Sequence, residues 1–303
     1  MLRSFLLYLS ERENLKRLLI ESSIGRRMAA RFIAGEDLDS AVRAVRQLNS
    51  DGFDVTLDFL GESVYATAEA EEACKVYLGM LDRLAAEGLR SHISIKPTQL
   101  GLALDEDLAG RLLSELAQRA ALHQNFVRID MESSAHTEST LRVFQRVNAP
   151  RDVMGVVIQS YLRRSEKDVD NLVKAGARVR LVKGAYQEPP DLAFPRKADV
   201  DASFVKLMET LLLSGEFHAI ATHDPRMIAA TQSYAKQHGL ASTQYEFQML
   251  YGIGRKVQRD LLRQGYRVRI YVPYGHQWYP YFMRRLAERP ANLVFLMRNL
   301  FRA

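Results

Sequence analysis

The chain has 303 residues, 47% of them hydrophobic and 26% charged, with nine Pro and 17 Gly. This composition is that of a globular protein and excludes a disordered, collagen-like or disulfide-scaffolded chain. The net charge of +6 is concentrated in residues 255–302, where eleven Lys and Arg stand against two acidic residues, a pattern that fits an anionic partner and a solvated helix face equally well.

Cysteine usage and hydropathy indicate the expected setting. Cys74 is the one cysteine in the sequence, which excludes an internal disulfide or a Cys-based zinc site and favours a cytoplasmic protein. No apolar run approaches the roughly 20 residues that span a bilayer. The stretch Phe5–Leu9 is too short for the core of a signal peptide. We therefore expect a soluble chain without a targeting segment.

The first predicted element is a helix within an N-terminal helical segment, residues 1–50. Its apolar residues recur at helical spacing: Leu38, Val42, Val45 and Leu48. From residue 51 onwards, β-branched runs predict eight strands: Val55–Gly61, His92–Lys96, Phe126–Met131, Val153–Gln159, Val179–Gly184, Ala219–His223, Gln244–Met249 and Val268–Val272. Helices are predicted between them, including Glu69–Glu87, Asp105–Ala121, Thr137–Val147 and Asp199–Leu213. Two helix starts carry capping signals: Ser165 with Asp168, and Asp224 before Pro225.

Alternating strands and helices predict a parallel sheet, because parallel neighbours need a crossover connection. Eight strands over roughly 220 residues are the number of a closed barrel. An open doubly wound sheet is the alternative, but it would carry a Gly-rich phosphate-binding turn after its first strand, and Gly61-Glu62-Ser63 is not one. We therefore predict an α/β fold, a (βα)8 TIM-type barrel formed by residues 51–303.

Several predicted strands are apolar on one face and polar or charged on the other. The polar faces consist of His92, Ser94 and Lys96; Arg128 and Asp130; Arg178 and Arg180; and Arg269 and Tyr271. If the apolar faces meet the helices, the charged faces converge inside the barrel, nearest its C-terminal mouth, where active sites of this fold lie. Because buried charges are costly without partners, Asp130 is expected to pair with a Lys or Arg of another strand. A salt-bridge network without a function is the alternative.

Two polar clusters follow predicted strand ends. In the stretch from Arg180 to Tyr186, Gly184 permits close approach of the backbone to a ligand, and Lys183 can offset negative charge on a cofactor. His223 precedes Asp224-Pro225. It has too few neighbouring ligands for a typical metal site, so we interpret it as donating to a ligand or being satisfied locally. A metal ligand is the alternative.

A third cluster follows the last predicted strand. Tyr281, Arg284, Arg285 and Glu288 share a predicted helix. Two guanidinium groups beside an aromatic ring suit bidentate binding of a small carboxylate, and Glu288 lies four residues from Arg284, where it can orient that side chain. An exposed helix without a ligand is the alternative.

With these clusters, the sequence resembles the proline dehydrogenase family, particularly its short, single-function bacterial members. The matching stretches run in order from about residue 50 to the end of the chain. They are Ser94–Gly101, Val127–Glu132, Val157–Leu162, Arg180–Tyr186, Thr222-His223, Tyr245–Gly252 and Tyr271–Glu288. Pro97 departs from the family pattern, and because proline lacks an N–H, hydrogen bonding just after Lys96 is expected to differ.

The resemblance implies a distorted barrel whose last helix lies over the mouth and whose FAD is bound there non-covalently. It implies a flavoprotein oxidoreductase that oxidises L-proline to Δ1-pyrroline-5-carboxylate, the first step of proline degradation to glutamate, and passes the electrons to a membrane quinone. A separate pyrroline-5-carboxylate dehydrogenase would consume the product, because the further domains of bifunctional relatives are absent. Peripheral contact with the inner face of the cell membrane is expected through the amphipathic tail, residues 292–301. Docking of that tail on the barrel is the alternative.

The resemblance also implies roles for individual residues. Lys96, Arg284 and Arg285 would bind the proline carboxylate, and Glu288 would orient the arginines. The remaining substrate contacts would be Tyr271, Tyr281, Leu250 and Tyr186. The expected catalytic residues are Asp130, Arg180, Lys96 and Tyr271. The expected FAD contacts are Met131, Gln159, Arg180, Val182, Lys183, Gly184, Thr222 and His223. Residues Pro195–Lys197 resemble the family's flexible segment over the cofactor.

Two other functions stay open. Lys96 or Lys183 could be the Schiff-base lysine of an aldolase or lyase built on the same barrel. The basic C-terminal part could instead belong to a module that binds nucleic acid or a membrane surface. The resemblance favours the oxidoreductase, without a nucleic-acid partner and without a metal ion.

Overall fold

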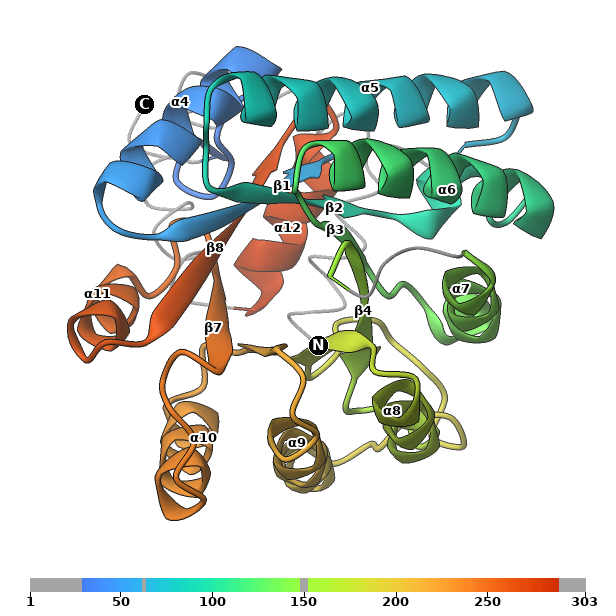
Figure 1. Ribbon diagram of the computed structural model, residues 1–303. Coiled ribbons are helices and arrows are strands. Elements are labelled where there is room, and N and C mark those ends of the chain that lie inside the picture. The colour runs from blue at the N-terminus through green and yellow to red at the C-terminus, as the bar shows by residue number, and fades with distance from the viewer. Residues whose placement is uncertain (1–28, 62–63, 148–151, 289–303) are drawn as a thin grey trace, which may run out of the picture.

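The computed structural model describes residues 29–61, 64–147 and 152–288, and of residues 284–288 it describes the backbone. Eight parallel strands close into a barrel (Figure 1), in which each strand pairs with the next along the chain and β8 pairs with β1. The strands are β1 Asp54–Phe59, β2 Ser91–Ile95, β3 Val127–Ile129, β4 Met154–Gln159, β5 Arg178–Val182, β6 His218–Ala221, β7 Tyr245–Leu250 and β8 Arg267–Tyr274. The predicted (βα)8 barrel is therefore confirmed.

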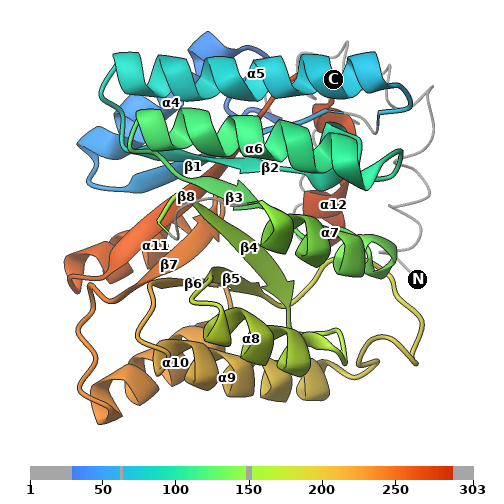
Figure 2. The ribbon, with the colours of Figure 1, turned by 45° about the vertical axis from the view of Figure 1, so that its right-hand side comes forward.

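Helices surround the barrel and connect its strands. They are α4 Leu38–Ser50, α5 Thr67–Ala86, α6 Glu106–Leu122, α7 Ser134–Arg146, α8 Ser165–Lys174, α9 Lys197–Leu212, α10 Pro225–Gln237, α11 Arg255–Arg263 and α12 Trp278–Glu288, with a 3-10 turn at Pro97–Leu100. In the turned view, α12 lies beside the carboxyl ends of the strands (Figure 2). None of the helices in the described residues combines the length and the hydrophobicity that crossing a bilayer requires.

The hydrophobic core lies between the strands and the outer helices. Alternate strand residues such as Leu57, Ile95 and Leu181 are fully buried there against helix residues such as Leu81 and Leu116. The intervening residues point into the barrel. Apolar layers fill the interior of most barrels of this kind. The polar side chains in this interior therefore indicate that the barrel binds a ligand.

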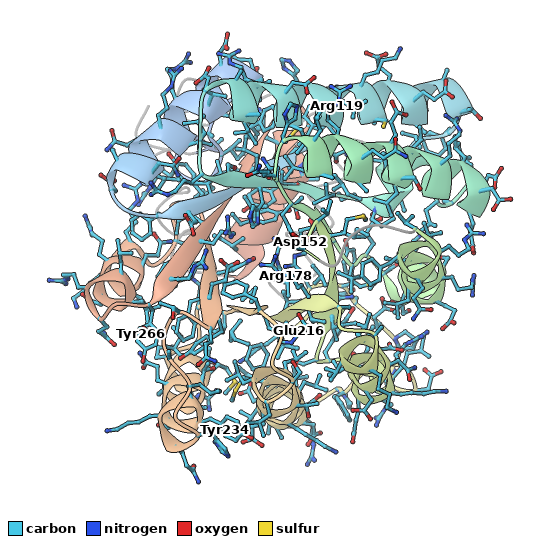
Figure 3. The ribbon with its side chains drawn as sticks, viewed as in Figure 1. Arg119, Asp152, Arg178, Glu216, Tyr234 and Tyr266 are labelled. Atoms are coloured by element: carbon cyan, nitrogen blue, oxygen red, sulfur yellow. The ribbon has the colours of Figure 1, made fainter. Side chains whose placement is uncertain are left out.

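The inward polar side chains form two layers. An upper layer near the carboxyl ends contains Ser94, Lys96, Asp130, Arg180 and Tyr271, and a lower layer near the amino ends contains His92, Arg128, Arg178, Glu246 and Arg269. Figure 3 labels Arg178 inside the ring of strands, seen from the amino end. The expectation that all these charges converge at the C-terminal mouth is therefore wrong for the lower layer. Each strand residue advances about 3.3 Å, so side chains two positions apart lie at different depths.

Backbone oxygens, an ion pair and aromatic rings hold the lower layer, and the buried Nε atoms of Arg128 and Arg178 have no hydrogen-bond partner among the described residues. Arg269 pairs with Glu246 at 2.9 Å, and Arg128 donates to the carbonyl oxygens of Val156 and Arg178 at 3.1 and 2.7 Å. The Arg178 guanidinium lies 4.6 and 5.0 Å from the ring centres of Phe126 and Phe217. These contacts give the amino end of the barrel a structural role.

The two predicted helix starts differ in their chemistry. At α10, the Asp224 carboxylate accepts from the amide of Arg226 at 3.0 Å and Pro225 is the first helical residue, as predicted. At α8, Ser165 is the first helical residue, but its hydroxyl donates to the carbonyl oxygen of Gln159 at 2.6 Å. The predicted cap by Ser165 is wrong, because this buried hydroxyl satisfies the last carbonyl of β4.

Gly155 on β4 makes room for the lower layer. A Cβ atom at this position would lie 2.2 Å from the Arg178 carbonyl oxygen and 2.5 Å from Arg128 Nη1. Gly79, in the middle of α5, is exposed, and a Cβ atom added there would have no neighbouring atom within 4 Å. The same substitution should therefore have opposite effects at the two glycines.

We expect Gly155→Ala to lower the free energy of unfolding by about 1–3 kcal/mol, because the added methyl group overpacks the barrel interior. Gly79→Ala should raise it by about 0.5–1 kcal/mol, because alanine favours the helix. Urea denaturation of both variants measures the difference. Equal stability changes in the two variants would contradict this account of the interior.

Candidate active site

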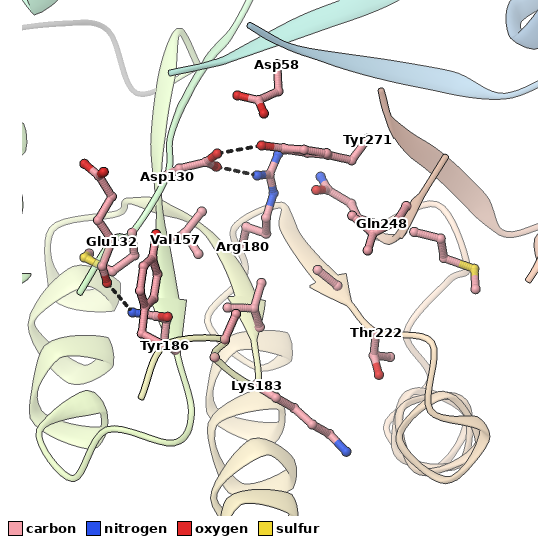
Figure 4. Close-up of a pocket in the computed structure, with 18 of the residues that line it drawn as sticks. Asp58, Asp130, Glu132, Val157, Arg180, Lys183, Tyr186, Thr222, Gln248 and Tyr271 are labelled. Atoms are coloured by element: carbon pink, nitrogen blue, oxygen red, sulfur yellow. Dashed lines mark hydrogen bonds and ion pairs between the residues drawn. The ribbon is translucent and has the colours of Figure 1, made fainter. Parts of the chain in front are cut away.

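A cavity of about 320 Å³ opens at the carboxyl ends of the strands. Every strand, or the segment just after it, contributes to the lining, and Tyr281 of α12 adds to it. Figure 4 shows labelled side chains that reach this cavity from different strands. A concave site at this face, with a few polar groups among apolar walls, is where barrels of this type bind small molecules.

Asp130 is the centre of the polar floor. Its Oδ1 accepts from Arg180 Nη1 at 2.8 Å and from Ser94 Oγ at 2.7 Å, and its Oδ2 accepts from the Tyr271 hydroxyl at 2.8 Å (Figure 4). The predicted pairing of Asp130 with a cation of another strand is confirmed. Desolvation and the charges of Asp130 and Asp58 raise the pKa of Tyr271 well above its ordinary value, so this hydroxyl keeps its proton and donates.

Lys96 lies between two carboxylates. Its Nζ forms an ion pair with Asp58 and lies 3.9 Å from Asp130 Oδ2. Desolvation alone would lower the pKa of Lys96, but Asp58 and Asp130 outweigh it and raise the pKa. Lys96 is therefore an ammonium ion, a state suited to binding a carboxylate. A Schiff-base lysine must react as the neutral amine, so this pairing argues against the aldolase or lyase reading.

Asp58 is a site residue that the sequence analysis missed. It lies on β1 and is 1% exposed. Burial raises its pKa above the ordinary value in spite of the attraction of Lys96. The signal was present: Asp54, Thr56 and Asp58 alternate with the apolar residues of β1, as in the strands that were recognised.

Arg180 has hydrogen-bonding capacity left over. Its Nε and Nη2 atoms are buried and have no hydrogen-bond partner among the described residues. The guanidinium carbon lies 5.4 Å from the centre of the Tyr271 ring, and the side chain lines the cavity. Buried donors without acceptors are unfavourable by about 1–3 kcal/mol each. The Nε atoms of Arg128 and Arg178 are buried without a partner as well, but of these three arginines Arg180 alone lines the cavity. This floor therefore fits a bound molecule that brings acceptors or negative charge.

The residues expected to contact FAD line the same cavity: Met131, Gln159, Arg180, Val182, Lys183, Gly184, Thr222 and His223. So do the expected substrate contacts Tyr186, Leu250, Tyr271 and Tyr281. Tyr186 is 42% exposed, so it lies at the rim. Most of the residues predicted from the sequence thus line one cavity, and they come from both ends of the barrel segment.

Lys183 is held away from the polar floor. Its Nζ pairs with Asp201 at 2.5 Å and with Asp224 at 2.8 Å, and in Figure 4 its side chain points away from Asp130. Burial alone would raise the pKa of Asp224, but hydrogen bonds from Lys183 and Arg226 lower it. Lys197 and Arg226 pair with the same two carboxylates, so Lys183 belongs to a cluster in which three basic side chains share two acidic ones.

Three other predicted features are explained by the structure around them. Gly184 has φ of 111°, and a Cβ there would lie 2.2 Å from the ring of Tyr161, so close packing on this ring requires the glycine. His223 Nε2 accepts from the amide of Leu250 at 2.9 Å. Pro97 is the first residue of the 3-10 turn, a position where the missing N–H costs nothing.

The third cluster is described in part. Tyr281 is 6% exposed and lines the cavity. The side chains of Arg284, Arg285 and Glu288, and the tail, residues 292–301, lie outside the described residues. Their assignment to the substrate carboxylate and to the membrane stays a prediction.

Comparison with known proteins gives a consistent result. The chain matches the proline dehydrogenase family model over residues 41–298. It is 42% identical over 299 residues to proline dehydrogenase 2 of Bacillus subtilis, covering 98% of both chains. It is 38% identical over 280 residues to proline dehydrogenase of Deinococcus radiodurans, covering 91% of this chain and 90% of that one.

A solved structure is similar as well. The structure of proline utilization A from Bdellovibrio bacteriovorus, inactivated by N-propargylglycine, superposes with a TM-score of 0.82 at 27% identity. The match covers 87% of this chain and 33% of that protein. The chain therefore spans about a third of the length of this larger relative.

The pairing of Lys96 predicts its reactivity. In Asp58→Asn the ammonium loses its nearest carboxylate, so the pKa of Lys96 should fall and its acetylation by acetic anhydride should rise several-fold at a fixed mildly alkaline pH. Glu166→Gln is the control, because the Glu166 carboxylate pairs with Lys206 and does not act on Lys96. Mass spectrometry of the Lys96 peptide measures the labelling. Equal labelling in the two variants would show that Asp58 does not control this lysine.

Proposed function

The chain belongs to the proline dehydrogenase family, and we propose that it oxidises L-proline to Δ1-pyrroline-5-carboxylate with a non-covalently bound FAD and a quinone as the final acceptor. The observation that carries this proposal is the polar floor, where Asp130 holds Arg180 and Tyr271 beneath a cavity while two buried guanidinium nitrogens lack acceptors among the described residues. The proposed reaction begins the degradation of proline to glutamate.

The cavity lining fits a flavin. Val157, Val182 and Leu250 offer apolar surface for a flat ring, and Arg180 offers donors for its ring nitrogens and carbonyl oxygens. When bound, FAD supplies the hydride acceptor that amino acid side chains lack. The protein contributes orientation and electrostatics. We propose that Arg180 favours negative charge on the bound ring, because a preorganised cation at low dielectric stabilises charge that develops beside it.

Substrate binding follows from the charge of the remaining groups. We propose that the proline carboxylate binds Lys96, Arg284 and Arg285, with Glu288 orienting the arginines. Tyr271, Tyr281 and Leu250 would enclose the apolar ring, and Tyr186 would close the rim. Fixing the carboxylate in this way orients the carbon that loses hydride, which is how positioning lowers a reaction barrier.

The partners follow from the chemistry of the reaction. A quinone dissolves in the membrane, so we propose peripheral contact with the membrane at the inner face of the cell, through the amphipathic tail, residues 292–301. The product is a reactive cyclic imine, and we propose that a separate pyrroline-5-carboxylate dehydrogenase consumes it. The Schiff-base alternative is disfavoured because Lys96 and Lys183 are both paired with carboxylates.

An absorption spectrum tests cofactor and substrate together. We expect the purified protein, loaded with FAD, to show flavin bands that bleach when L-proline is added without oxygen. Flavin bands that do not change with proline would support FAD as the cofactor and contradict proline as the substrate. Failure to bind FAD would contradict the cofactor and favour a lysine-based reaction, which borohydride trapping of a substrate would then detect.

Arg284→Met tests the carboxylate assignment. We expect it to raise the KM for proline by roughly 10- to 100-fold, because a charge-assisted hydrogen bond is worth about 1.5–3 kcal/mol. The KM for the quinone should change little. Arg259→Met, at an exposed position of α11, is the control. Steady-state kinetics with both substrates varied measures the effect, and an unchanged proline KM would remove Arg284 from the site.

A further inference from the structure

A short segment ahead of the family match reaches the mouth of the barrel. Residues 29–36, here called the N-terminal brace, precede residue 41, where the family match begins. The amide of Ala34 donates to the carbonyl of Pro273 at 2.9 Å, and the amide of Gly275 donates to the carbonyl of Gly35 at 3.0 Å. These two bonds join the N-terminal brace to the end of β8 and to the connection that leads into α12.

The N-terminal brace also packs without slack against the loop after β7. Gly252 has φ of 73°, and a Cβ there would lie 1.6 Å from the carbonyl oxygen of Arg31. Backbone therefore touches backbone at this point. Contacts with the loop after β7 and with the end of β8 fix the N-terminal brace in position, so a helix that packs against it is fixed as well.

Helix α12 rests on the N-terminal brace. The ring of Phe32, 5% exposed, lies 6.2 Å from the ring of Phe282, which is fully buried and lies 5.9 Å from the Trp278 ring. The Trp278 indole nitrogen donates to Glu36 Oε1 at 2.9 Å, and His276 Nδ1 lies 3.3 Å from Glu36 Oε2. An aromatic cluster thus holds the side of α12, and Glu36 holds its first turn.

The same helix contributes to the cavity. Tyr281 lines it, and positions 284 and 285 follow one turn later in α12. Any rotation or shift of the helix moves these positions together. Misplacing a binding group by about 1 Å can cost up to about 100-fold in rate.

We propose that Phe32 and Glu36 are positioning residues for substrate binding, because they fix α12 where its arginines meet the substrate carboxylate. This inference rests on the proposed function, in which those arginines bind proline. Neither residue lines the cavity, so each acts indirectly, through its contacts with α12 and the residues that lead into it.

The first test compares the loss of two phenylalanine rings in the FAD-loaded protein. We expect Phe32→Ala to raise the KM for proline about tenfold with little change in kcat. Trp278→Phe removes the indole N–H that binds Glu36, and we expect it to raise this KM about threefold. Phe217→Ala is the matched control, because the Phe217 ring contacts Arg178 and Arg267 instead. Flavin content and Tm, measured for each variant, restrict the comparison to folded protein. An unchanged KM in Phe32→Ala, or an equal rise in Phe217→Ala, would overturn the proposal.

A double-mutant cycle separates this inference from the proposed function. If Phe32 acts by placing Arg284 and Arg285, Phe32→Ala should raise KM no further in an Arg284→Met/Arg285→Met background. A second, multiplicative rise would mean that Phe32 acts by another route and would overturn the inference. A normal KM in Arg284→Met alone would contradict the proposed carboxylate site. A raised KM in Arg284→Met with a normal KM in Phe32→Ala would overturn the positioning role of the N-terminal brace alone.

Discussion

One partly buried carboxylate, that of Asp130, holds the candidate site together. Ionised groups inside a barrel are tolerated when each has partners, and Asp130 is the shared partner of Arg180, Ser94 and Tyr271. Its position just after β3 lets it reach β2, β5 and β8 at once. Without this carboxylate, the guanidinium would lose its counter-charge and the phenol its acceptor, so the orientation of the whole floor depends on it.

Much of this arrangement could be predicted because alternation along a strand fixes which side chains point inward. The alternating pattern around Arg128, Arg180 and Tyr271 predicted charged side chains in the lumen. The number of predicted strands, eight, predicted a closed barrel. The depth of a side chain along the barrel axis was harder to predict. Alternation assigns a face, but the register between strands decides whether an inward residue such as Arg178 lies near the mouth or at the opposite end.

Other features depended on contacts between distant parts of the chain. The capping signal at Ser165 is local, whereas the hydrogen bond that its hydroxyl makes is to β4. The need for glycine at position 184 comes from the ring of Tyr161, which no local pattern indicates. Asp58 was detectable from alternation on β1, but its importance comes from Lys96, 38 residues later. Phe32 and Phe282 meet from opposite ends of the described chain.

The closure of the barrel has a consequence for synthesis of the protein. The first strand pairs with the last, and the phenol that binds Asp130 arrives on β8. A nascent chain that has emerged only as far as β7 therefore holds an incomplete floor and an open sheet edge. The site comes into being late, when the final strand leaves the ribosome, and a cofactor that needs the complete floor can be captured only after that event.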